Sequence, residues 1–228
     1  MTKTKKGQFI ELEFTGLHNG KVFDSNIEED LKKVNENAKA EKMIIVIGEG
    51  MVVAGLDKAL EDKELNKEYE IHLTHMEAFG ERKRDLVKTL PLSVFSSQKV
   101  NPYPGATFFL DNFLVRVITV SGARVITDFN NPLAGKDLDY KFKITRIVDN
   151  DRERAESLFR FFFRMIPEFE ITDKIIVKGE KPLEYAVNIY NDKFKNLLGK
   201  EIIFEEVKKK QEKEAKDKEK PLEKASNS

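Results

Sequence analysis

Alternation of apolar and polar positions predicts most strands in the first half of the chain. In residues 7–14, Phe9, Leu12 and Phe14 stand among polar residues, as in a half-buried strand. An Asn-Gly dipeptide follows, which favours a hairpin turn, and Lys21–Asp24 begins the return strand. The same criterion predicts strands at Met43–Ile47, Tyr69–Met76 and Tyr140–Val148, a short helix at Met51–Leu60, and a charged helix or long loop at Ile27–Lys42.

The pattern changes after Gly80 and returns near Val125. Between them, Leu86–Gly122 carries short apolar runs broken by prolines and a glycine, which is typical of a small β-rich unit. The residues around 128–136 then predict a turn followed by a loop.

A third region begins near Asn150. Residues Asp151–Pro167 predict a helix, because apolar side chains recur at helical spacing and a proline ends the segment. Those side chains are Leu158, Phe161, Phe162, Met165 and Ile166, with Phe159 and Phe163 on an adjacent face. Strands are predicted at Lys174–Val177, Tyr185–Tyr190 and Glu201–Val207, a short helix at Phe194–Leu198, and a solvated, charged tail at 208–228.

Composition narrows the function. Lys plus Arg and Asp plus Glu both number 40, so the balanced charge argues against a general nucleic-acid binder. Cysteine is absent, which fits a reducing cytosol, and no apolar run is long enough for a bilayer. We therefore expect a cytoplasmic protein. His72 and His75 are three residues apart on a predicted strand, so they should face opposite ways, and no metal site is predicted.

Four short motifs follow one another in a characteristic order over about eighty residues. They are Phe14–Gly16, Val22–Ser25, Val46–Leu56 with its Val52-Val53-x-Gly55-Leu56 end, and Ala78–Gly80. Together they resemble the FKBP-type peptidyl-prolyl isomerases. The segment Asn131–Lys136 resembles the flap of the SlyD-like branch, which carries an insert in that flap.

This resemblance implies an α+β fold. An FKBP-like twisted antiparallel half-barrel (1–85 and 128–150) would wrap a short helix and carry a β-rich insert-in-flap domain (86–127). A C-terminal α/β domain (151–207) and the charged tail (208–228) would follow, as in larger archaeal members of the branch.

The resemblance also implies a catalytic pocket. Its residues would be Phe14, Phe23, Asp24, Met43, Val52, Val53, Leu56, Phe79, Leu133 and Tyr140. Phe14 and Phe79 stand where the family usually has Tyr, and Leu56 where eukaryotic members have Trp, which should weaken macrolide binding. In such a dry pocket the planar amide is disfavoured relative to the twisted one, without any nucleophile, metal or cofactor. The Val53 N–H would bind a substrate carbonyl, and Asp24 would orient pocket groups.

Two further surfaces are expected. In the insert, Val94, Phe95, Val100, Tyr103, Phe108 and Phe109 are candidates to grip unfolded or proline-containing polypeptides. Some apolar residues of the insert must form its own core, and the alternative is that all of them serve only that core. The C-terminal region is too small to enclose its Phe-rich helix, so we expect a homodimer through Phe159, Phe162, Phe163 and Ile166.

The leading hypothesis is thus a peptidyl-prolyl cis-trans isomerase that is also a folding chaperone. The sequence leaves open a non-catalytic FKBP-like binding module. It also leaves open a ribosome- or RNA-associated factor, which would rest on Arg82–Arg84 and the charged tail.

Overall fold

The computed structural model describes residues 3–110 and 113–207, so the predicted charged tail lies outside the described residues. The chain divides into two compact units between Ser157 and Leu158. Helices and antiparallel sheets both contribute, and the α+β prediction is confirmed. No helix in the described ranges combines the length and the apolar character of a bilayer-spanning segment.

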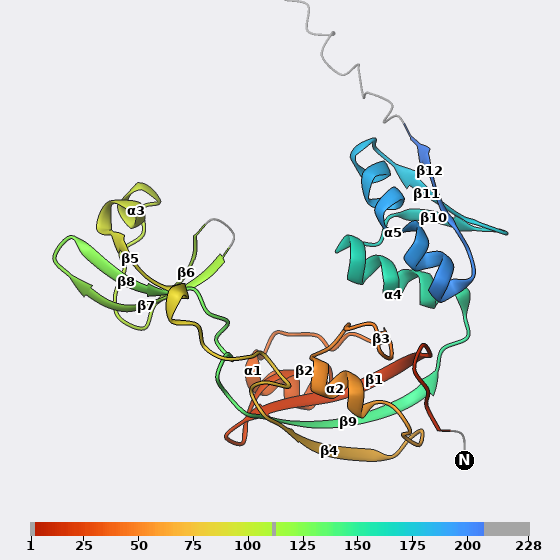
Figure 1. Cartoon of the computed structure of the whole chain (residues 1–228), viewed down its shortest axis with the longest axis horizontal. Coiled ribbons are helices and arrows are strands. Elements are labelled where there is room, and N and C mark those ends of the chain that lie inside the picture. The colour runs from red at the N-terminus through yellow and green to blue at the C-terminus, as the bar shows by residue number, and fades with distance from the viewer. Residues whose placement is uncertain (1–2, 111–112, 208–228) are drawn as a thin grey trace, which may run out of the picture. The chain divides into compact units, whose positions relative to one another are not determined.

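The first sheet is an antiparallel arrangement centred on one long strand, β1, and its partner β9 (Figure 1). Its strand order is β2-β1-β9-β4, with β3 also paired to β1. The predicted strands are confirmed, and β1 runs further than the alternation indicated. The elements are β1 (Phe9–His18), β2 (Lys21–Ser25), α1 (Glu28–Val34), β3 (Met43–Val46), α2 (Ala54–Ala59), β4 (Glu68–Leu73) and β9 (Leu138–Ile147).

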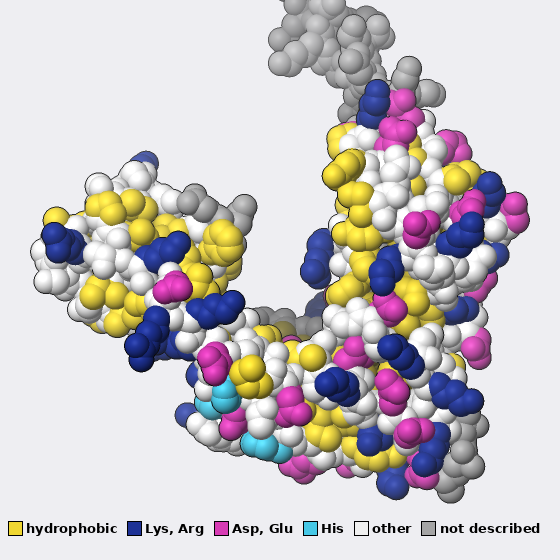
Figure 2. All heavy atoms as spheres, in the orientation of Figure 1, with side chains coloured by type: hydrophobic (Ala, Val, Ile, Leu, Met, Phe, Trp, Pro, Cys, Tyr) yellow, Lys and Arg dark blue, Asp and Glu magenta, His cyan; other side chains and the backbone are white. Residues whose placement is uncertain are grey.

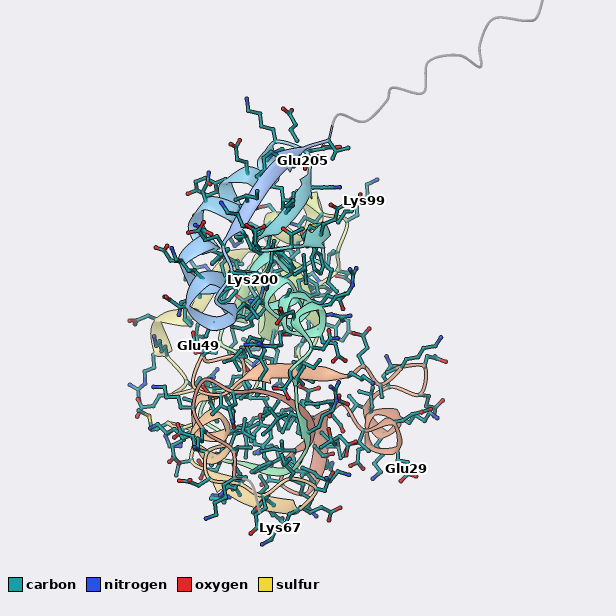
Figure 3. All side chains as sticks on the ribbon, turned by 90° about the vertical axis from the view of Figure 1, so that its right-hand side faces the viewer. Glu29, Glu49, Lys67, Lys99, Lys200 and Glu205 are labelled. Atoms are coloured by element: carbon teal, nitrogen blue, oxygen red, sulfur yellow. The ribbon has the colours of Figure 1, made fainter. Side chains whose placement is uncertain are left out.

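Helix α2 packs its apolar side on this sheet. Leu56 and Leu60 are four residues apart, so they lie on one helix face, and both are buried in a cluster with strand residues such as Leu12 and Ile144. Figure 1 shows α2 against one face of the sheet, as the resemblance implied. Charged residues on α1 and just before β4 point outward, as Glu29 and Lys67 do in Figure 3.

The insert has a sheet and a core of its own. Four strands pair antiparallel in the order β5-β8-β7-β6. Its elements are η1 (Arg84–Leu86), β5 (Val87–Pro91), α3 (Leu92–Ser97), β6 (Thr107–Leu110), β7 (Phe113–Ser121) and β8 (Arg124–Asp128). Phe95 is fully enclosed by Leu110, Val115, Val117 and Val125, which explains why so small a unit holds together.

The C-terminal elements form a three-stranded sheet with two helices. The sheet order is β10-β11-β12; the first pair is antiparallel, and the second is parallel and connected through α5. The elements are α4 (Asp151–Phe163), β10 (Glu168–Ile171), β11 (Ile175–Gly179), α5 (Pro182–Leu198) and β12 (Ile202–Glu206). The unit division falls inside α4, whereas the sequence placed the domain boundary before it.

Two predictions in this region are wrong. Tyr185–Tyr190 is not a strand but part of α5, a helix with Pro182 in its first turn and the left-handed Gly199 after its end. Phe159 is not at a dimer surface: it is fully buried, with its ring centroid 4.8 Å from that of Phe194 and 5.0 Å from that of Phe169. The contacts of Phe159 with Phe169 and Phe194 form a core within this region. The expectation that the region is too small to enclose its Phe-rich helix did not take such a core into account.

Candidate active site

Phe14 is fixed on β1 by its backbone. Its N–H donates to Asn26 Oδ1 at 2.8 Å, and its carbonyl accepts from the Asn26 N–H at 3.2 Å and from Ser25 Oγ at 2.9 Å. Asn26 Nδ2 also donates to the Leu12 carbonyl at 2.7 Å. Sequence reasoning missed Ser25 and Asn26 as site-building residues, although short polar side chains after a strand are the usual signal for such backbone bonds.

The approach to α2 is held by a buried carboxylate. Asp57 accepts from the Gly48 N–H at 2.8 Å and from the Gly50 N–H at 2.9 Å. Both glycines have left-handed φ angles, which other residues rarely adopt. These bonds fold residues 48–50 into the turn that leads to Val52 and Val53. Asp57 was not predicted, because nothing in its local sequence distinguishes a carboxylate facing inward from one facing solvent.

Phe79 and Leu133 lie on two turns that a single hydrogen bond connects. The Gly135 N–H donates to the Gly80 carbonyl at 2.7 Å, although the whole insert separates them in sequence. Asn131 shapes the second turn by accepting from the Leu133 N–H at 2.8 Å. The flap therefore closes back on the segment that precedes the insert.

Nine of the ten candidate site residues pack in one apolar cluster with the core of the first sheet. Three are buried: Phe14, Leu56 and Tyr140. Six are partly exposed and packed against the same cluster: Phe23, Met43, Val52, Val53, Phe79 and Leu133. Segments from β1 to β9 thus contribute to one cluster, and six of the nine residues keep part of their side chain open to solvent.

Asp24 is the tenth residue and lies beside this cluster. It is exposed by surface area, yet nearby atoms displace enough water to raise the pKa of its carboxyl, with the Ser25 backbone acting in the opposite sense. Burial, and then the charge of Asp24, raise the pKa of Tyr140 to about 12. The Tyr140 ring meets Phe23 edge-on at 5.9 Å and Phe14 at 6.2 Å between centroids.

All three histidines lie beside the start of β9. His72 bonds Asp139 at 2.7 Å, His75 bonds Asp137 at 3.0 Å, and His18 bonds the Asp137 carbonyl at 3.0 Å. Strand β4 ends at Leu73, so the predicted opposite orientation of two histidines on one strand is wrong. Among residues 3–110 and 113–207, no group of three or more His, Cys, Asp or Glu could hold a metal ion.

The six candidate peptide-binding residues of the insert separate into two groups. Phe95 is wholly internal, which corrects its assignment to a binding surface, and Val94, Val100 and Phe108 pack against the same core. Tyr103 and Phe109 are 63% and 72% exposed. Phe113, Leu114 and Ile118 are exposed as well. Figure 2 shows hydrophobic side chains gathered on the visible face of the insert.

Comparisons with known proteins agree with this arrangement. Residues 1–94 match the family of FKBP-type peptidyl-prolyl cis-trans isomerases, and residues 88–133 match the IF domain of FKBP26. The short-type peptidyl-prolyl cis-trans isomerase of Methanocaldococcus jannaschii is 25% identical over 152 residues, covering 65% of this chain and 97% of the relative.

Bacterial relatives extend the similarity. The FKBP-type isomerase SlyD of Treponema pallidum is 32% identical over 119 residues, which is 50% of this chain and 68% of the relative. SlyD of Helicobacter pylori is 27% identical over 143 residues, which is 61% of this chain and 71% of the relative. Together with the converging site residues, these matches show that the chain belongs to the FKBP-type peptidyl-prolyl cis-trans isomerase family and is an isomerase of that type.

Proposed function

We propose that the open side of the apolar cluster is the pocket in which X–Pro bonds isomerise, and that the insert holds unfolded chain close to it. The observation that carries the first part is the convergence of nine candidate residues on one partly exposed cluster. The second part is supported by the exposed aromatic and aliphatic side chains of the insert.

An apolar pocket accelerates this reaction through the electronic difference between its two states. Rotation about the X–Pro bond breaks amide resonance, and the barrier is roughly 18–20 kcal/mol. The planar amide has a more polar carbonyl than the twisted one, so removal from water disfavours the ground state more than the transition state. Phe23, Val52 and Phe79, which are only partly buried, would supply that dry surface, and no group in this scheme needs to transfer a proton.

The Val53 N–H would hold a substrate carbonyl during rotation. Val53 immediately precedes α2, and within the described residues its N–H donates to no protein acceptor. The Gly55 N–H, by contrast, is occupied by the Glu77 carbonyl at 2.8 Å.

Truncation of Phe23 tests the pocket. Phe23→Ala removes a partly exposed ring of the cluster, and kcat/KM for exchange in an X–Pro peptide should fall roughly ten-fold or more, because the remaining walls no longer enclose the amide. Leu65→Ala is the matched control, since Leu65 is also partly buried against this cluster but is not a candidate site residue. Equal activity in both variants, measured by NMR exchange without a protease, would contradict the pocket.

The insert is expected to act through local concentration. A chain held on Phe109 and Leu114, which are cross-strand partners on β6 and β7, would present its prolines repeatedly to the pocket. Phe109→Ser combined with Leu114→Ser should slow the refolding of a proline-limited protein and leave peptide isomerisation unchanged. Val34→Ser, which removes an apolar side chain 47% exposed on α1, is the control. Unchanged refolding in the double variant would refute this role.

A homodimer through the C-terminal region remains a proposal with a revised contact. Phe159 is internal, whereas Tyr185 and Ile189 are 75% and 51% exposed one turn apart on α5. A dimer should cover them, and sedimentation of the full chain should then change from dimer to monomer in Tyr185→Ser with Ile189→Ser. A monomeric unmodified chain would end the proposal, as would an unchanged dimer in the double variant.

A cytoplasmic location also remains a prediction.

A further inference from the structure

The Tyr140 hydroxyl is a polar group that the isomerisation scheme above does not use. The residue is only 4% exposed, and its ring is enclosed by Phe14 and Phe23. Within residues 3–110 and 113–207 the hydroxyl has no hydrogen-bond partner, and it is not among the side-chain atoms fully enclosed without one. The oxygen therefore keeps contact with solvent while the rest of the side chain is buried.

Strand register places Tyr140 and Asp24 on either side of Gly16. Gly16 on β1 pairs with Tyr140 on β9 and with Asp24 on β2, so the two residues are the cross-strand neighbours on either side of a glycine. The space that a side chain of Gly16 would need is filled by the Phe23 ring, whose Cζ lies 2.5 Å from the position of a Cβ. A hydroxyl, a carboxylate and an aromatic ring thus share one side of the candidate pocket.

These two polar groups have different hydrogen-bonding capacities. An ionised carboxylate such as Asp24 only accepts, whereas a neutral phenol donates. The pKa of Tyr140 lies near 12, so its proton stays in place under all physiological conditions. Among the side chains of the ten candidate residues, Tyr140 is therefore the constant donor.

The chemistry of the substrate requires donors. An X–Pro segment has no N–H at proline but has two carbonyls, one before and one after the ring. When apolar walls remove such carbonyls from water, each must find a new donor or binding is weakened. One backbone donor, the Val53 N–H, serves one carbonyl in the scheme above, and the other remains to be matched.

We infer that the Tyr140 hydroxyl donates a hydrogen bond to a backbone carbonyl flanking the bound proline and thereby sets the affinity for peptide. This inference rests on the proposed pocket. Because the carbonyl is present before and during rotation, the bond stabilises ground and transition states alike, so it acts on KM rather than on kcat.

Removal of one oxygen atom tests this inference. Tyr140→Phe keeps the ring, and KM for an X–Pro peptide should rise roughly three- to ten-fold, the usual value of one hydrogen bond, with kcat nearly unchanged. The increase should be the same between about pH 6 and pH 9, since the phenol does not titrate there. An unchanged KM, or a loss confined to kcat, would overturn the inference.

Tyr69→Phe is the matched control. Tyr69 lies on β4 in the same cluster, and its hydroxyl accepts from the Glu64 N–H at 2.9 Å, so this variant loses a structural bond without touching substrate. Stability should fall in the control, while KM stays at the unmodified value. Phe23→Ala distinguishes the failure of the proposed pocket from the failure of the proposed role of the hydroxyl. If Phe23→Ala retains activity, the proposed pocket is refuted. If Phe23→Ala loses activity while Tyr140→Phe keeps the unmodified KM, only the role of the hydroxyl is refuted.

Discussion

Gly16→Ala is the smallest change that should disturb the candidate site directly. A Cβ at this position would lie 2.5 Å from Phe23 Cζ and 3.0 and 3.1 Å from two further ring carbons. The φ angle of Gly16 is not left-handed, so alanine fits the backbone and the conflict is confined to the ring. Relief requires Phe23 to move by about 1 Å, which disturbs its edge-on contact with Tyr140.

The energetic cost follows from two opposing terms. Overpacking of this kind destabilises a protein by about 1–3 kcal/mol. The loss of glycine's freedom in the unfolded chain returns about 0.4–1 kcal/mol. We expect a net loss of about 1–2 kcal/mol in the free energy of unfolding. Catalysis should suffer more, because a displacement of about 1 Å in a positioning group reduces rates by up to about a hundred-fold.

The assay is cis–trans exchange in an X–Pro peptide, measured by NMR, together with urea denaturation of the same samples. Gly179→Ala is the matched control: its Cβ would meet Leu183 Cδ2 at 2.9 Å, but Gly179 belongs to the other compact unit. We expect kcat/KM to fall at least ten-fold in Gly16→Ala and to stay unchanged in the control. A folded Gly16→Ala protein with unaltered kcat/KM would show that the Phe23 ring position does not matter for turnover.

Three further outcomes are expected. Phe95→Ala should unfold the insert, at a cost of about 3–5 kcal/mol, and abolish its hydrogen-exchange protection while peptide isomerisation persists. Arg146→Met, which removes ion pairs at 2.7 Å to two glutamates, should lower stability by about 1 kcal/mol in urea titrations at low salt and by less at high salt. The hydrogen bond that the protonated His72 ring donates to the Asp139 carboxylate raises the pKa of His72. The contribution of this bond to stability is therefore complete below the ordinary pKa of about 6.5 and is lost as pH rises through the folded-state value. His72→Gln should remove this pH dependence, and an NMR titration that gives His72 a pKa below the ordinary value would contradict the prediction.

The alternation of apolar and polar residues was sufficient to predict the strands of the first sheet, because one face of each strand is buried. On β9, Leu138, Tyr140, Phe142 and Ile144 are all internal, and polar residues separate them. The pattern therefore records burial directly. It could not give the order of strands, since β1 pairs with β2, β3 and β9 through registers that only the folded chain defines.

Only the end of helix α5, Phe194–Leu198, was predicted as a helix, because the periodic signal of the whole helix extends over more residues than its first half shows. Tyr185–Tyr190 contains aromatic and β-branched residues, which favour a strand when taken alone. Val187 and Phe194, the buried residues of α5, are seven apart and recur at helical spacing only over the full 17 residues. Local propensity was thus overridden by the packing of one continuous helix face.

The candidate site was identified by resemblance, and physical reasoning alone would not have assembled it. Its residues come from segments separated by the insert, and spacing along the chain contains no sign that the turn with Phe79 is hydrogen-bonded to the turn with Leu133. Asn26 and Asp57, which hold the backbone around the site, carry no local pattern that marks them. Their roles depend on hydrogen bonds to residues 7 to 14 positions away.

Residues 82–83 and 128–130 form the neck that joins the insert to the first sheet, between the candidate site and the proposed binding surface. The Lys83 N–H donates to Asn130 Oδ1 at 2.8 Å, and Asn130 Nδ2 donates back to the Lys83 carbonyl at 2.9 Å. Arg82 adds two bonds to Asp128 at 2.8 and 2.9 Å. These bonds hold the two ends of the insert together at its base, between the insert and the two turns that carry Phe79 and Leu133. Since the cost of loop closure grows only slowly with length, the insert could change in size or sequence while the site remains intact.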